Sequence, residues 1–117
     1  MEYRVDLLKS TVKELSVSVN VDEESKFQID SGNTASVFEP TNETDPTVLI
    51  RSECTMRDNA TNKLSIGMKA EFIFKFDPLP ENRTAVASEY CPEIIAKEFN
   101  RIAVDILKDM GHQFKIE

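Results

Sequence analysis

The strongest constraint on the fold is an unbroken alternation of apolar and polar residues near the middle of the chain. Seven apolar side chains occupy every second position, namely Leu64, Ile66, Met68, Ala70, Phe72, Phe74 and Phe76. Because successive side chains of a strand point to opposite faces of a sheet, this pattern predicts a long strand with one buried face. A slip of one residue would expose the whole set, so the register of this strand is strongly specified.

Three further segments alternate in a similar way. Residues 48–56 predict the antiparallel partner of the long strand in a hairpin. Residues 5–21 predict a first strand, with a bulge interpreted at residues 10–11. Residues 26–38 predict a second strand that is interrupted at residues 31–33.

One helix is predicted near the end of the chain. It would begin at Pro92, whose missing N–H is tolerated in a first turn, and end at Gly111, which can adopt the left-handed conformation of a helix stop. Glu93 in the first turn and Lys108 in the last would both interact favourably with the helix dipole. The apolar stripe runs at helical spacing through Ile95, Phe99, Ile102 and Ile106.

Together these elements predict an α+β fold in a single domain of residues 1–117, a four-stranded antiparallel sheet with one long C-terminal helix packed on one face. One helix can hardly cover four strands, so apolar surface should remain and we expect an oligomer or a bound partner. The row of Phe72, Phe74 and Phe76 has two interpretations. It forms either the core beneath the helix, which is favoured, or the lining of a binding groove.

The charge and hydropathy of the chain exclude several kinds of partner. A net charge of −7 argues against nucleic acid, since phosphate binding requires a basic surface. The same charge fits a basic partner or, as favoured, simple solubility. No apolar run approaches the roughly 20 residues that span a bilayer, so we expect no membrane insertion. The N-terminus lacks the basic start and apolar stretch of a secretion signal, so we expect a cytoplasmic protein.

Residues that carry catalysis are sparse. The single histidine, His112, follows the predicted helix end, and Cys54 and Cys91 do not have the spacing of a zinc site. None of the three glycines forms a phosphate-binding loop. We therefore expect no enzyme activity, no catalytic residues, no cofactor and no metal. Cys91 is interpreted either as a reactive thiol at a helix N-terminus or, as favoured, as a small buried side chain.

Three segments carry a resemblance to a known family. Residues 11–17 contain a Lys-acid-apolar-Ser-apolar run, and residues 70–76 contain an Ile-Phe pair within the long strand. Residues 90–95, Tyr-Cys-Pro-Glu-Ile-Ile, match a Tyr-Cys-Pro helix start and are the most specific of the three. With the order of the elements, these segments resemble the SecB family, the bacterial protein-export chaperones, over nearly the whole chain.

The resemblance implies a SecB-like ATP-independent holdase that binds non-native polypeptides as a homo-oligomer, either a dimer or a tetramer. Its clients would be exported proteins or a dedicated antitoxin. The family's second helix and acidic tail have no counterpart in the 117 residues, and Ser18, Ser65 and Gly67 stand where the acidic patch for the translocation ATPase would be. Glu14 matches one position of that patch and is the partner-docking candidate, so the resemblance gives little support for ATPase docking. The chain also resembles the shorter SecB-like relatives, some of which act as chaperones for toxin–antitoxin pairs and others of which have no assigned role.

Two sets of residues are candidates for binding. Client-binding candidates are apolar residues expected in connections, where no regular element hides them: Val37, Phe38, Leu79, Val86 and Phe114. Oligomer-interface candidates are expected on the exposed side of the first strand and the outer side of the helix: Val17, Val19, Ile94 and Val104. The alternative function is a structural or interaction protein, such as a prophage or regulatory module, that keeps the SecB-like fold and binds one folded partner. Of the two functions the holdase is favoured, and the sequence leaves the client open.

Overall fold

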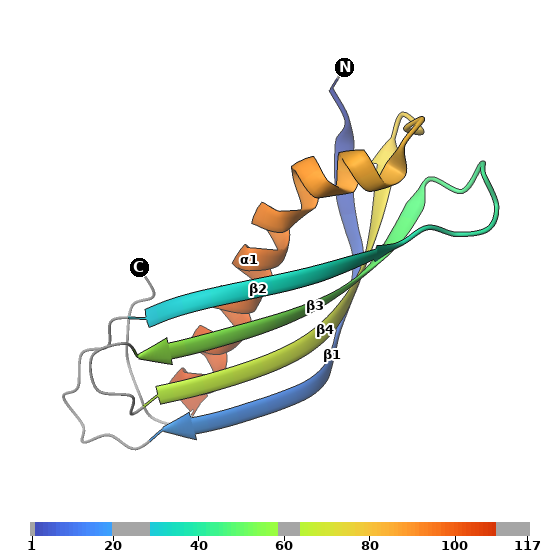
Figure 1. The fold of residues 1–117 in the computed structure, drawn as a ribbon. Helices are drawn as coiled ribbons and strands as arrows, with labels where there is room; N and C mark the ends of the chain where they lie inside the picture. Colours follow the sequence, from blue (N-terminus) through green and yellow to red (C-terminus); the bar gives the residue numbers. More distant parts are fainter. Residues whose placement is uncertain (1, 20–28, 59–63, 110–117) are drawn as a thin grey trace.

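The computed structural model describes residues 2–19, 29–58 and 64–109. Four strands are followed by one helix: β1 (Arg4–Val19), β2 (Ile29–Phe38), β3 (Thr47–Asp58), β4 (Leu64–Asp77) and α1 (Arg83–Asp109). The strands form one antiparallel sheet in the order β1-β4-β3-β2, and α1 lies on one face of it (Figure 1). We call the face that α1 covers the inner face and the opposite one the outer face. The predicted α+β fold is confirmed.

β4 lies inside the sheet and forms the floor of the core. Its seven alternating apolar side chains are buried against α1, each at most 3 % exposed. The phenylalanines of this row are therefore core residues, and Phe72 meets Phe99 of α1 edge-on, with the ring centroids 5.5 Å apart. Burying a side chain of this size stabilises by roughly 1.5–3 kcal/mol, so this row holds the sheet and the helix together.

β1 carries two bulges, and the single bulge predicted at residues 10–11 is wrong. The pairing with β4 shifts at Leu8 and again at Lys13. Each shift exchanges the two faces of the strand, so that between the bulges Ser10 and Val12 pair with inward-facing residues of β4. Such a shift depends on the partner strand, which is why the sequence of β1 did not locate it.

β2 is continuous, and the interruption predicted at residues 31–33 is also wrong. Its ten residues pair with β3 without a register shift, and Gly32 lies directly opposite Thr55. Nearly all of its described side chains are exposed because β2 is an edge strand. An exposed edge strand does not require alternating apolar residues, so the polar residues 31–33 were interpreted as an interruption of the strand.

α1 begins at Arg83, well before the predicted start at Pro92. Asn82 is the N-cap, because its side-chain oxygen accepts a hydrogen bond from the amide of Ala85 at 3.0 Å. Glu93 therefore lies inside the helix, and the prediction that it occupies the first turn is wrong. The prediction of a helix around Pro92 is confirmed, but Pro92 lies in the interior of the helix rather than at its start.

Pro92 lies in the first half of α1, and α1 is bent rather than straight (Figure 1). Proline has no N–H, so the carbonyl of Ser88 loses its usual helical partner and the helix bends. Buried residues occur on both sides of Pro92, so both parts of the bent helix pack on the core: Arg83, Val86, Ala87, Cys91, Ile95, Phe99, Ala103 and Leu107. At the other end Lys108 lies in the last turn as predicted, whereas Gly111 lies outside the described residues.

Candidate polypeptide-binding surfaces

Both cysteines are buried in the core. Cys54 is 1 % exposed and Cys91 is 0 % exposed. Burial raises the pKa of the Cys54 thiol to about 11 and that of Cys91 to about 12, so both are protonated at neutral pH. The favoured interpretation of Cys91 as a small buried side chain is confirmed, although it lies inside α1 rather than before it. Over the described ranges, no cluster of His, Cys, Asp and Glu could hold a metal ion, and no helix is long and apolar enough to cross a membrane.

α1 leaves part of the inner face of β1 uncovered. The helix packs mainly on β2, β3 and β4. Leu15 lies opposite the buried Met68 and Val12 opposite the buried Ala70, yet Leu15 is 47 % and Val12 41 % exposed. Val17, next along this face, is half-buried against the core. We call Val12, Leu15 and Val17 the β1 strip.

One flank of α1 faces the side of the sheet that carries β1. Tyr90 meets Tyr3, just before β1, edge-on with the ring centroids 6.1 Å apart. Ile94 and Ile102 are half-buried against the core. Like Tyr90, each of them immediately precedes a buried residue of α1, so all three lie on one side of the helix. Apolar side chains thus line both the β1 strip and the neighbouring flank of the helix.

The predicted interface residues fall on two surfaces. Val17 and Ile94 lie at the β1 side of the molecule, as described above. Val104 is 38 % exposed and follows the buried Ala103, which places it on the opposite flank of α1. The side chain of Val19 lies outside the described part of the structure. Val17 lies opposite the inward-facing Ile66 and is half-buried, so the expectation that it lies on the exposed side of β1 is wrong. An interface through any of these residues stays a prediction.

A groove of about 270 Å³ lies between β2 and α1. Its lining is mainly small and aliphatic and includes Ala35, Val37, Ile50, Ala87, Cys91 and Ile95. Two hydroxyl groups in its wall are satisfied internally, since the Ser52 hydroxyl donates to the Thr34 carbonyl at 2.8 Å and the Ser88 hydroxyl to the Thr84 carbonyl at 2.9 Å. We call this depression the β2–α1 groove, and it can receive apolar side chains.

The two edges of the sheet differ in how they are protected. β1 contains two bulges and the charged residues Lys9, Lys13 and Glu14, all of which discourage pairing with a further strand. β2 pairs regularly with β3, contains neither lysine nor proline, and carries a single charged residue, Asp30, near its start. A long unguarded edge is a template for another strand. β2 is therefore the edge at which an extended segment can pair, directly beside the β2–α1 groove.

Val37 and Phe38, predicted to lie in a connection, form the end of β2 instead. That prediction is wrong because β2 continues without a break, and alternation within the strand then separates the two residues. Val37 lines the β2–α1 groove. Phe38 lies on the outer face, where the guanidinium of Arg51 lies 4.9 Å from the centre of its ring. The structure thus assigns only one of them to the groove.

Val86 was also predicted to lie in a connection, and this is wrong because α1 starts before it. Its side chain is 8 % exposed and belongs to the core. Leu79 does lie in the connection between β4 and α1 and is 44 % exposed, but it borders a depression at another end of the sheet, together with Arg4 and Lys75. Phe114 lies outside the described residues. The predicted client residues are therefore not gathered into one site.

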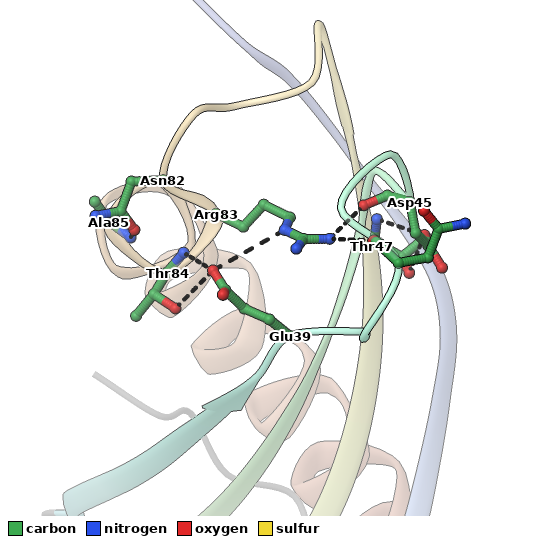
Figure 2. Close-up of polar contacts among 8 residues, drawn as sticks. Glu39, Asp45, Thr47, Asn82, Arg83, Thr84 and Ala85 are labelled. Atoms are coloured by element: carbon green, nitrogen blue, oxygen red, sulfur yellow. Dashed lines mark hydrogen bonds and ion pairs between the residues drawn. The ribbon is translucent and has the colours of Figure 1, made fainter.

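A polar clasp ties the connection between β2 and β3 to the start of α1 (Figure 2). Arg83 is 9 % exposed, and its Nη1 donates to the carbonyl oxygens of Asp45 at 2.6 Å and Asn42 at 3.3 Å. Glu39 Oε1 accepts hydrogen bonds from the amide and the hydroxyl of Thr84, both at 3.1 Å, and lies 4.0 Å from Arg83 Nε. Since Glu39 directly follows β2, the clasp fixes the end of this strand against the helix and with it one end of the groove.

The same connection is braced by two side-chain turns. Asn42 Oδ1 accepts hydrogen bonds from the hydroxyl of Thr44 at 2.8 Å and its amide at 3.0 Å. Asp45 Oδ1 accepts them from the hydroxyl of Thr47 at 2.7 Å and its amide at 3.0 Å, and these bonds hold the pKa of Asp45 below its usual value. Sequence reasoning missed the clasp. The Asn/Asp-x-Thr spacing signals only a local turn, and nothing relates it to Arg83.

The outer face carries two rows of alternating charge. Across β1, β4 and β3 one row consists of Lys13, Glu71 and Arg51, with ion pairs of 3.3 Å and 3.0 Å. The adjacent row consists of Glu14, Lys69 and Glu53, with ion pairs of 3.4 Å and 3.7 Å. Glu14, the predicted partner-docking residue, is thus already paired, and its hydrogen bond is the largest cause of a raised pKa at Lys69.

Comparison with known proteins gives a clear result only at the level of the fold. No protein-family model and no curated protein matches the chain. Among solved structures it is similar to the Mycobacterium tuberculosis Rv1957 SecB-like chaperone in complex with a ChAD peptide from the Rv1956 HigA1 antitoxin. The TM-score is 0.68 at 11 % sequence identity, over 97 % of this chain and 86 % of that chain.

The fold is SecB-like. The predicted resemblance is therefore confirmed for the architecture, with the order of strands and the single long helix described above. On the inner side of this SecB-like fold, each edge of the sheet carries an apolar surface. One is the β2–α1 groove beside an unguarded edge, and the other is the β1 strip.

Proposed function

We propose that this protein is a SecB-like, ATP-independent chaperone that holds non-native polypeptides, either exported proteins or a dedicated client such as an antitoxin. The observation that carries the proposal is the β2–α1 groove, which opens beside the unguarded edge of β2. Further support comes from the structural neighbour, a SecB-like chaperone in complex with an antitoxin peptide.

The mode of binding follows from strand geometry. An extended segment that pairs with β2 gains main-chain hydrogen bonds, which do not depend on its side chains. Every second side chain of that segment faces the inner side of the sheet and can enter the β2–α1 groove. A volume of about 270 Å³ with small lining residues accepts aliphatic groups of varied shape, so many sequences can bind. Binding and release of this kind require no nucleotide.

We further propose that the protein acts as a cytoplasmic homo-oligomer. The β1 strip and the flank of α1 with Ile94 and Ile102 together leave apolar side chains partly exposed on one side of the molecule. Exposed apolar surface of this kind is typical of association, and a second copy is the partner always present with the first. The net charge of −7 favours basic clients and helps to keep a loaded complex soluble.

Two neighbouring residues of β2 provide a matched test of the groove. Ala35 lies opposite the buried Ser52 and lines the β2–α1 groove, whereas Ser36 lies opposite the exposed Arg51 and faces the outer side of the sheet. Ala35→Glu should abolish the suppression of aggregation, because a carboxylate in the groove would be desolvated by an apolar client. Ser36→Glu adds the same charge to the same strand and should leave suppression unchanged. The measurement is light scattering of a chemically unfolded reporter protein diluted into buffer with an equal concentration of each variant.

Thermal unfolding of both variants shows whether they keep the fold of the unmodified protein. Suppression by Ala35→Glu equal to that of the unmodified protein would remove the groove as the client site. No suppression by the unmodified protein at several-fold excess would exclude a general holdase. The alternative, a structural or interaction protein with one folded partner, would then be pursued by pull-down.

A further inference from the structure

The outer face carries an apolar row that neither the groove nor the clasp uses. Phe38, Leu49 and Ile73 lie directly opposite one another on β2, β3 and β4, and Lys9 of β1 completes the row. Phe38 is 45 % exposed, and Leu49 and Ile73 are half-buried although they face away from α1. The row crosses the whole sheet from one edge to the other. We call these residues the outer row.

Three basic residues surround the outer row, although the chain carries a net charge of −7. Lys9 belongs to the row itself, Arg51 follows Leu49 by two positions and Lys75 follows Ile73 by two, so all of them lie on the outer face. Among the residues that the structure describes, Lys9 and Lys75 form no ion pair. A ligand at the outer row would therefore meet positive charge.

Two acidic side chains also border the outer row, and each already has a cationic partner. Glu71 pairs with Arg51 at 3.0 Å and with Lys13 at 3.3 Å, and these contacts lower the pKa of its carboxyl group. Asp6 pairs with Arg4 at 3.2 Å. Glu71 with Arg51 and Lys13 leaves one net positive charge and Asp6 with Arg4 leaves none, so the carboxylates do not cancel the charges of Lys9 and Lys75.

We propose that the outer row is a docking site for an amphipathic helix of a partner protein, with an apolar stripe flanked by acidic side chains. Neighbouring strands lie about 4.8 Å apart, so the apolar groups of the row recur at that distance. Successive turns of a helix recur at about 5.4 Å, so one apolar side chain per turn can meet each strand in order. Side chains on the same face of an extended segment are about 6.8 Å apart, so their spacing would not match that of the row.

Arg51 is held in a position from which it can bind a carboxylate of such a helix. Its guanidinium lies 4.9 Å from the centre of the Phe38 ring, and its Nε donates to Glu71 at 3.0 Å. These two contacts restrict the long side chain at the border of the outer row. A guanidinium carries five N–H donors, so further donors remain for an incoming acidic group.

The outer row is independent of the proposed chaperone function because it lies on the face opposite the β2–α1 groove. Its chemistry also differs from the acidic docking patch that the family resemblance implies. Glu14, the residue that matches that patch, is paired with Lys69 at 3.4 Å. The partner expected at the outer row is therefore acidic, not basic.

The test uses two amphipathic peptides of about 18 residues, long enough to form a helix. Both carry the same leucine stripe, flanked by glutamate in one peptide and by lysine in the other. Fluorescence anisotropy with the full chain should show binding of the glutamate peptide only, weakening as salt is raised. Phe38→Ser and Lys75→Glu should each weaken binding at least about tenfold. Arg57→Glu makes the same charge change on the outer face near the far end of β3 and should leave the affinity unchanged.

Equal binding of the two peptides, or no binding of the glutamate peptide at millimolar concentration, would overturn the proposal. So would an effect of Arg57→Glu as large as that of Lys75→Glu. A lower sedimenting mass of Phe38→Ser than of the unmodified protein would show that a second copy occupies the outer row instead. Ala35 lies opposite the inward-facing Ser52, so a glutamate at this position points to the inner face and Ala35→Glu should bind the glutamate peptide normally. A failed chaperone test therefore does not decide whether the outer row binds a helix.

Discussion

Cys54 and Cys91 show how position within an element sets the chemistry of a residue. The neighbouring Pro92 suggested that the Cys91 thiol faces the N-terminus of a helix, where a thiolate would be stabilised. Because α1 begins at Arg83, Cys91 lies inside the helix and points into the core instead. Burial then raises its pKa to about 12. The residue serves packing.

The raised thiol pKa values predict a loss of stability in alkali. In the unfolded chain both thiols have the ordinary pKa of 9.0 and lose their protons above that pH, whereas in the folded protein they keep them. This contribution is therefore complete below about pH 9 and is lost as the pH rises towards the folded-state values. Urea unfolding at a series of pH values should show the decline, and Cys91→Ala should show a shallower one. Reaction of the folded protein with a thiol reagent at neutral pH, as fast as in denaturant, would contradict the burial of both cysteines.

At the scale of elements, the sequence predicted those strands and helices correctly in which one buried face imposes a regular spacing of apolar residues. β4 was recognised because its inward side chains are all apolar, and the helix was recognised from its stripe. The start of α1 was missed because Pro92 is a strong signal for a first turn, whereas the actual N-cap at Asn82 precedes a weakly apolar stretch. The two bulges of β1 and the continuity of β2 were missed because both depend on the neighbouring strand.

The candidate site was less predictable than the fold, for a related reason. Val37 was predicted to bind a client from a connection, but it lies in β2 and lines the β2–α1 groove, whose other wall comes from α1. Phe38 was singled out too, yet its neighbours Leu49 and Ile73 belong to other strands. Surfaces built from several elements require the strand order and register, which alternation within one segment does not contain.

Arg83 provides a test of the clasp that joins the loop after β2 to α1. Arg83→Ala removes the hydrogen bonds to the carbonyl oxygens of Asn42 and Asp45 and should lower the free energy of unfolding by about 1.5–3 kcal/mol. Arg101→Ala is the matched control, because Arg101 lies on the same helix but makes only exposed ion pairs, and it should change stability little. Urea unfolding of the two variants compares them. Equal effects would mean that the clasp does not stabilise the loop.

At the scale of the whole molecule, the two edges of the sheet are unlike, and this difference organises the surface. β2 offers a backbone edge and a groove, whereas β1 offers a guarded edge but exposed aliphatic side chains. A single helix produces the difference, because it packs mainly on β2, β3 and β4 and cannot also cover β1. The SecB-like fold therefore leaves one edge suited to an extended segment and another suited to side-chain packing. We expect these to serve the client and a second copy respectively.

Substitution of Leu15 tests the expectation that the β1 strip binds a second copy of the chain. The Leu15 side chain is 47 % exposed within the β1 strip, whereas Ser16, the next residue, pairs with Gly67 and faces the outer side of the sheet. Leu15→Glu should convert the oligomer into monomers in sedimentation velocity, because a second copy would have to bury the carboxylate. Ser16→Glu places the same charge on the other face and should keep the mass of the unmodified protein. If Leu15→Glu also keeps that mass, the β1 strip is not the interface. If instead it becomes monomeric and still suppresses aggregation of the unfolded reporter, the β2–α1 groove of one chain is sufficient for holding a client, and oligomerisation serves only to cover β1.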